Sequence, residues 1–153
     1  MEQYFNENFF WDTDNRVCSC VLTAHGVEFY GTATCHPNDE DMKSVRTGEI
    51  IAFNRAYIKY LQHMRNTQVD PILKVLTDLY KNMASSHRFN SKSFEAIQLY
   101  KEIKYYEENK RVINQLIKDT REYLKNYIDE KDKFYQRMRK SKENDEPAKV
   151  ALD

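Results

Sequence analysis

The hydrophobic period of this chain changes partway along, and that change constrains the fold more than any other feature of the sequence. Upstream of residue 35, apolar and polar side chains alternate, which is typical of β-strands with one buried face. From about residue 47 onward, apolar side chains recur every three or four residues, which indicates amphipathic helices. The break lies at Cys35, His36 and Pro37. We therefore expect an α+β fold in which a small sheet precedes long helices.

Two strands are predicted at residues 17–24 and 27–35, joined by a two-residue turn at His25 and Gly26. Short turns ending in glycine favour the tight hairpin geometry that matches the twist of paired strands. This turn sorts the apolar side chains of both strands onto one face of the sheet. The pairs on that face are Cys18 with Ala33, Cys20 with Gly31, Leu22 with Phe29 and Ala24 with Val27.

A third antiparallel strand is predicted at residues 2–11, because residues 12–15 supply the polar side chains of a turn before the hairpin. A hairpin alone is marginally stable in water, whereas three strands packed on a helix form a stable unit. Gly31 lies in the middle of its strand. The missing side chain there allows the backbone of a helix, or a ligand, to approach closely.

Cysteines and histidines near the sheet form a pool of possible metal ligands. The pool consists of Cys18, Cys20, His25, Cys35 and His36. A Cys-x-Cys pair on one strand differs from the usual zinc spacing, and the sequence has no second Cys-x-x-Cys pair. We therefore expect Cys18 and Cys20 to be small buried side chains, and we predict neither a metal nor a cofactor.

The helical part is predicted to be a long antiparallel hairpin. Its first half begins with a helix from about residue 47 to 65, capped by Ser44 or Thr47. Asp70 and Pro71 then read as an N-cap and a first helical residue, so this half is either one kinked helix or two helices. Residues 84–91 have the composition of a loop, and a single helix from about residue 92 to 140 follows.

Two series of core positions repeat every seven residues along this last helix. One series is Leu99, Tyr106, Ile113, Thr120, Tyr127 and Phe134, and the other is Ile103, Lys110, Ile117, Leu124, Lys131 and Met138. Lys110 and Lys131 interrupt the stripe, and polar core positions often set the oligomeric state. A hairpin of two helices leaves apolar surface uncovered, so we expect a homo-oligomer, at least a dimer.

The length of 153 residues suits one domain. We expect it to span residues 1–140, with the sheet at 2–36, the helical hairpin at 44–140 and a disordered tail at 141–153. Lys and Arg number 24 and Asp and Glu number 24, so zero net charge argues against a general nucleic-acid binder. Neither a membrane span nor a secretory signal is recognisable, so we expect an intracellular protein.

No nucleotide-binding glycine loop or hydrolase motif occurs in the sequence, so we expect no enzyme. Arg55 lies within an apolar helical stretch, where a guanidinium needs either an internal acidic partner or a bound phosphate or carboxylate. Phe89 and Asn90 fall in the predicted loop. They either contact a base, by stacking and by hydrogen bonding, or close the hairpin end with Asn90 or Ser91 as N-cap.

The sequences of residues 31–41, GTATCHPNDED, and of residues 48–59, GEIIAFNRAYIK, resemble small bacteriophage proteins of the anti-Thoeris sponge family. The resemblance is best over residues 17–59, and the layout extends it to about residue 139. It implies a phage-encoded dimer that sequesters a cyclic ADP-ribose isomer intact in the host bacterial cytoplasm, with cyclic oligonucleotides as possible further ligands. The ligand-binding residues that the resemblance implies are Arg55, Phe89, Asn90, Lys110 and Arg111.

Two other functions compete with sequestration of a cyclic nucleotide. A coiled-coil adaptor or inhibitor of a host protein would use an apolar stripe on the last helix that self-association leaves uncovered. A nucleic-acid accessory protein would use a cluster of basic residues near the C-terminus, which the zero net charge disfavours. The cluster consists of Arg137, Arg139, Lys140 and Lys142.

Overall fold

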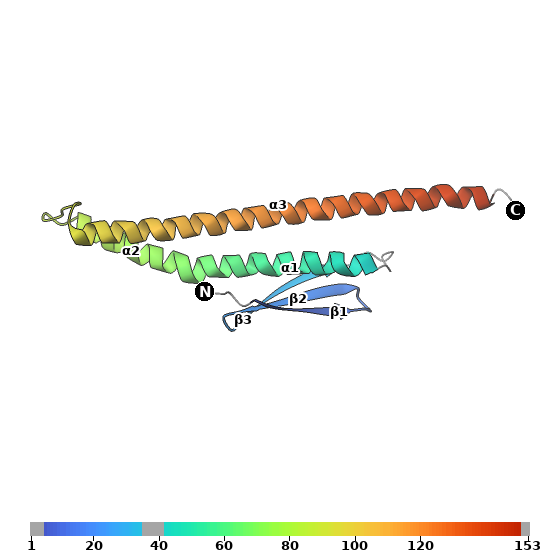
Figure 1. Ribbon diagram of the computed structural model, residues 1–153, viewed down its shortest axis with the longest axis horizontal. Helices are drawn as coiled ribbons and strands as arrows, with labels where there is room; N and C mark the ends of the chain where they lie inside the picture. The colour runs from blue at the N-terminus through green and yellow to red at the C-terminus, as the bar shows by residue number, and fades with distance from the viewer. Residues whose placement is uncertain (1–4, 35–41, 151–153) are drawn as a thin grey trace.

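The computed structural model describes residues 5–34 and 42–150 of the chain. Three strands, β1 (Asn6–Asp12), β2 (Val17–Ala24) and β3 (Val27–Thr34), form an antiparallel sheet of order β1-β2-β3. The helical elements are α1 (Met42–Met64), the π-helical turn η1 (Arg65–Val69), α2 (Asp70–Ala84) and α3 (Phe94–Val150). The sheet packs on one side of α1 and α3 runs along the other side (Figure 1). The α+β class predicted from the sequence is therefore confirmed.

The hairpin of β2 and β3 has the predicted register. Cys20 pairs with Gly31 and Leu22 pairs with Phe29, and the side chains of all four pairs predicted for this face are buried except that of Val27. Both turn residues have positive φ, 52° at His25 and 75° at Gly26. Two positive φ values are the requirement of the tight turn that suits twisted strands.

Strand β1 pairs with β2 and begins at Asn6, and the first four residues lie outside the described part of the chain. The turn that follows depends on Asp12, whose Oδ1 accepts the backbone N–H groups of Asp14 at 3.1 Å and Asn15 at 3.2 Å. The Asn15 side-chain amide also donates to Asp12 Oδ2 at 2.8 Å. These bonds, with that of the Asn15 amide foremost, lower the pKa of Asp12. The polar residues predicted to form this turn do so.

The main core lies between the sheet and α1. Ala52 and Ala56 of α1 are fully buried, and they face Gly31 of β3. A Cβ atom at Gly31 would overlap the Ala52 carbonyl oxygen and lie 2.5 Å from the Ala56 backbone nitrogen. Gly31 thus serves the close approach of a helix, one of the two roles expected for it.

Helices α1 and α2 form one continuous helical arm through the π turn η1. The Asp70 N–H donates to the Arg65 carbonyl, which lies five residues earlier rather than four. Pro71 has no N–H and its ring would clash with the carbonyl of a regular turn, and a π turn accommodates both effects. The prediction that Asp70 is an N-cap was wrong, because Val69 occupies that position and no side chain caps it.

The other predicted helix ends also differ from the structure. Helix α1 begins at Met42, so Ser44 and Thr47 both lie inside it rather than capping it, and Thr47 is buried. Helix α3 begins at Phe94, and the Ser93 hydroxyl accepts the Ala96 N–H at 3.2 Å, so Ser93 is the cap rather than Asn90 or Ser91. Helix α3 continues to residue 150, so residues 141–150, expected to be disordered, are helical.

The seven-residue repeat on α3 matches the observed burial over most of its length. Ile103, Ile117 and Leu124 are buried, whereas Phe134 is 46% exposed and Met138 is 47% exposed. The last part of α3 runs past the start of α1 (Figure 1). No helix in the described part of the chain is long and apolar enough to cross a membrane.

Candidate functional site

Arg55 holds the edge of the sheet to α1. Its Nη1 donates to the Thr32 carbonyl of β3 at 2.6 Å, and Lys59, one turn later, donates from Nζ to the Tyr30 carbonyl at 2.7 Å. Strand β3 is an edge strand, so its outward carbonyls have no neighbouring strand. Arg55 thus binds a backbone carbonyl, whereas the sequence predicted either an internal acidic partner or a bound phosphate or carboxylate.

Lys110 and Arg111 are both engaged by carboxylates. Lys110 Nζ lies 2.9 Å from Asp70 Oδ1, an ion pair that joins α3 to α2 although its alignment falls short of a hydrogen bond. Arg111 forms a two-pronged pair with Glu108 on the same helix, with Nε donating to Oε2 at 2.9 Å. The hydrogen bonds between them lower the pKa of Glu108 and raise that of Arg111.

Phe89 and Asn90 lie in the loop that joins α2 to α3. The Phe89 ring packs edge-to-face on Tyr80, with centroids 5.9 Å apart, which supports the hypothesis that Phe89 closes this end. The Asn90 side-chain oxygen accepts the Lys92 N–H at 3.0 Å. This bond shapes the turn that leads into α3.

An open hollow of about 340 Å³ lies at this loop. Its lining combines an aromatic ring, a guanidinium, a carboxylate, an amide and two hydroxyls: Met83, Ser86, Arg88, Phe89, Asn90, Ser93 and Glu95. We call this the tip hollow. Its size falls within the range of small-molecule sites, and its polar groups sit beside an apolar patch. Ser86 and Glu95 were not among the predicted site residues. The resemblance did not imply Arg88, although it belongs to the same candidate loop as Phe89 and Asn90.

The five predicted ligand residues do not come together in one chain. Arg55 lies on α1 beside the sheet, Lys110 and Arg111 lie level with the start of α2, and Phe89 and Asn90 lie beyond its end. Helix α2 has 15 residues, so roughly 20 Å separates the last two groups. Only Phe89 and Asn90 of the five line the tip hollow.

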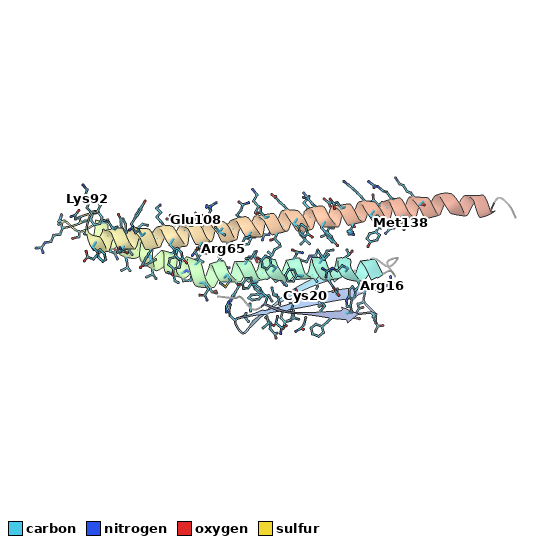
Figure 2. The ribbon with its side chains drawn as sticks, in the orientation of Figure 1. Arg16, Cys20, Arg65, Lys92, Glu108 and Met138 are labelled. Atoms are coloured by element: carbon cyan, nitrogen blue, oxygen red, sulfur yellow. The ribbon has the colours of Figure 1, made fainter. Side chains whose placement is uncertain are left out.

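The two cysteines of the hairpin belong to the core. Cys18 and Cys20 are fully buried, and Cys20 lies where the sheet faces α1 (Figure 2). Burial first, and then the charge of Glu7, raise the pKa of Cys20 to about 11. The Cys20 thiol therefore keeps its proton at neutral pH.

Among the described residues no group of three His, Cys, Asp or Glu side chains is placed to hold a metal ion. Cys35 and His36, the other candidates at the end of the hairpin, lie outside the described residues. Comparison with known proteins finds no matching family model, no matching curated protein and no matching solved structure. The functional argument therefore depends on the residues of this chain.

Proposed function

We propose that this protein is a phage-encoded anti-defence protein that binds a cyclic nucleotide signal in the host cytoplasm and sequesters it without cleaving it. A cyclic ADP-ribose isomer is the proposed ligand. The observation that carries the proposal is the tip hollow, which gathers Arg88, Phe89 and Asn90 into one open site. The resemblance of residues 31–41 and 48–59 to the sponge family supports the same function.

The groups lining the tip hollow suit the parts of such a ligand. A diphosphate is bound by a guanidinium, which Arg88 supplies, and by the N-terminus of a helix, which α3 supplies beginning at Phe94. A purine stacks on an aromatic ring such as Phe89. Ribose hydroxyls donate hydrogen bonds to a carboxylate, which Glu95 supplies.

The proposal changes the ligand residues that the sequence resemblance implied. Arg55 binds a backbone carbonyl, and Lys110 and Arg111 are paired with carboxylates, so their charges already have protein partners. In the proposed site Arg88 provides the cation instead. Phe89 and Asn90 keep the roles that the resemblance implied for them.

Calorimetric titration with cyclic ADP-ribose isomers tests the proposal. We expect one isomer to bind, and we expect Arg88→Ala to weaken that binding at least about ten-fold, the loss of one charge-assisted contact. The matched control is Arg111→Ala. Arg111 is also an exposed arginine, but it lies on α3 outside the tip hollow and is paired with Glu108. This control is expected to bind as the wild type does.

The fate of the ligand separates sequestration from turnover. Heating the complex should release the same isomer intact, as judged by chromatography and mass spectrometry. Recovery of a hydrolysed product would show that the protein is an enzyme. Absence of binding to every isomer and to cyclic oligonucleotides would contradict the proposed function. Equal weakening by Arg88→Ala and Arg111→Ala would place the ligand elsewhere on the molecule.

A further inference from the structure

The molecule has two helical arms, one formed by α1, η1 and α2 and the other by α3, and the pair has two different flanks. On one flank, polar contacts cross between the arms: Lys110 pairs with Asp70, and Arg65 Nη1 donates to Asn114 Oδ1 at 2.8 Å. The contacts also fix the relative level of the two arms, which run in opposite directions. A position five residues after Asp70 therefore lies level with the position five residues before Lys110.

Apolar side chains gather on the opposite flank of both arms. At about 100° per residue, those of α2 lie roughly 140–200° around the helix from Asp70, and those of α3 lie roughly 200–240° from Lys110. The α2 residues are Ile72, Val75 and Leu79, exposed by 38, 59 and 51%. The α3 residues are Tyr105, Val112, Leu116 and Tyr123, exposed by 62, 43, 40 and 51%.

We call these seven residues the apolar flank. The ion pair between Asp70 and Lys110 places Val75 level with Tyr105, so the two groups form one continuous surface. From Leu79 to Tyr123 the surface extends roughly 33 Å along the arms. Surfaces of this length and composition on a water-soluble fold are typical of protein interfaces.

The α3 part of the apolar flank has a palindromic order. Including the two polar positions between the apolar ones, the stripe reads Tyr105, Asn109, Val112, Leu116, Asp119 and Tyr123. The spacings are 4, 3, 4, 3 and 4 residues, the same from either end. The chemistry is also the same from either end, because an aromatic residue is followed by an amide or a carboxylate and then by an aliphatic residue.

We propose that a second copy of this chain covers the apolar flank, with its α3 antiparallel to the first about a two-fold axis between Val112 and Leu116. A two-fold axis presents each copy with the same stripe in reverse order, so a palindromic stripe matches itself. The axis sets Val112 against Leu116 of the second copy and Tyr105 against its Tyr123. The heptad spacing is the one that keeps two helices in contact along their length.

The polar positions of the stripe favour a second copy over an unrelated helix. In the same register Asn109 faces Asp119 of the second copy, and the amide donates where the carboxylate accepts. Asp119 already accepts the Gln115 amide at 2.8 Å through Oδ1, and a carboxylate has acceptor capacity for another donor. A direct pairing of Asp119 with itself, which would repel, does not occur in this register.

Light scattering after size-exclusion chromatography tests the interface. We expect the wild type to be a dimer and Val112→Glu to be a folded monomer, because the new charges meet apolar side chains near the axis. The matched control is Met138→Glu, since Met138 is also on α3 and is 47% exposed but lies outside the apolar flank. This control is expected to remain a dimer, and circular dichroism checks that both variants stay helical.

An exchange of the polar positions tests the register. Asn109→Asp sets two carboxylates together twice in each dimer, and we expect it to weaken the dimer at least about ten-fold. The double variant Asn109→Asp with Asp119→Asn restores an amide facing a carboxylate, and we expect it to recover most of the loss.

Three results would overturn the inference. They are a monomeric wild type, a dimer that only Met138→Glu dissociates, and a double variant as weak as Asn109→Asp. A monomeric wild type would leave the apolar flank open for a different protein. The apolar flank shares no residue with the tip hollow, and the inference does not depend on the proposed ligand, so each proposal can fail alone.

Discussion

The two ends of the molecule are packed in different ways. At the end with the sheet, which we call the base, Cys18, Cys20, Leu22, Ala52 and Ala56 are completely shielded from solvent. At the other end, α2 contains no buried residue although it carries a clear apolar face. The base therefore has a core of its own, whereas α2 depends on one-sided contact with α3.

This difference separates stability from binding. Buried apolar contacts determine how much free energy is required to open a segment. The base should therefore open last, and α2 and its loop should open first. The tip hollow and the α2 part of the apolar flank lie in the loosely packed end. Contacts with a ligand or a second copy would bury side chains at that end that the single chain leaves exposed.

The largest expected effect is at Gly31 in the base. Gly31→Val places a side chain into the backbone of α1, which cannot move without losing its own hydrogen bonds. We expect a loss of more than about 4 kcal/mol in the free energy of unfolding. Chemical denaturation followed by circular dichroism measures it.

The control for that change is the next residue of the same strand. Thr32 is exposed, and its backbone carbonyl rather than its side chain meets Arg55, so Thr32→Ala should change stability by less than about 0.5 kcal/mol. A Gly31→Val protein as stable as Thr32→Ala would mean that β3 and α1 are not in close contact.

A pair of identical substitutions compares the two ends directly. Leu22→Ala removes a fully buried side chain from the base and should cost about 3 kcal/mol. Leu79→Ala removes a side chain that is 51% exposed on α2 and should cost less than about 1 kcal/mol in the monomer. Equal losses, measured by denaturation at low protein concentration, would contradict the division into a packed base and a loose end.

The smallest expected effect concerns the sheet edge. Arg55→Ala removes the bond to the Thr32 carbonyl and should cost about 1 kcal/mol, since the contact is exposed. Arg46→Ala is the matched control on α1, where an exposed pair with Glu49 at 3.7 Å should contribute less than about 0.5 kcal/mol. If Arg55→Ala abolished ligand binding with unchanged stability, Arg55 would be a ligand contact.

Much of the base could be predicted because local rules decide it. The turn at His25 and Gly26 fixes the register, and a register shift of one residue would turn Leu22 outward. The glycine in mid-strand predicted a close approach, and the observed approach is that of α1. In these places residue type and spacing leave few alternatives.

The partners of polar side chains could not be predicted in the same way. Arg55 binds a carbonyl at a sheet edge, and every residue has a carbonyl, so no residue type marks the partner. The ion pair of Lys110 with Asp70 depends on the relative level of two arms, which the loop length does not fix. The helical state of residues 141–150 was missed because low hydrophobicity argues against a core but not against a helix rich in Lys and Glu.

The π turn at residues 65–69 has a consequence for how this chain tolerates insertions and deletions. A π turn holds one residue more than an α turn, and it absorbs that residue without the rotation of about 100° that an insertion into a regular helix would cause. Deleting one residue within the π turn would therefore keep the same face of α2 against α3, whereas deleting one elsewhere in α1 or α2 would turn that face away. Changes in length along these helices are therefore best tolerated at the π turn itself.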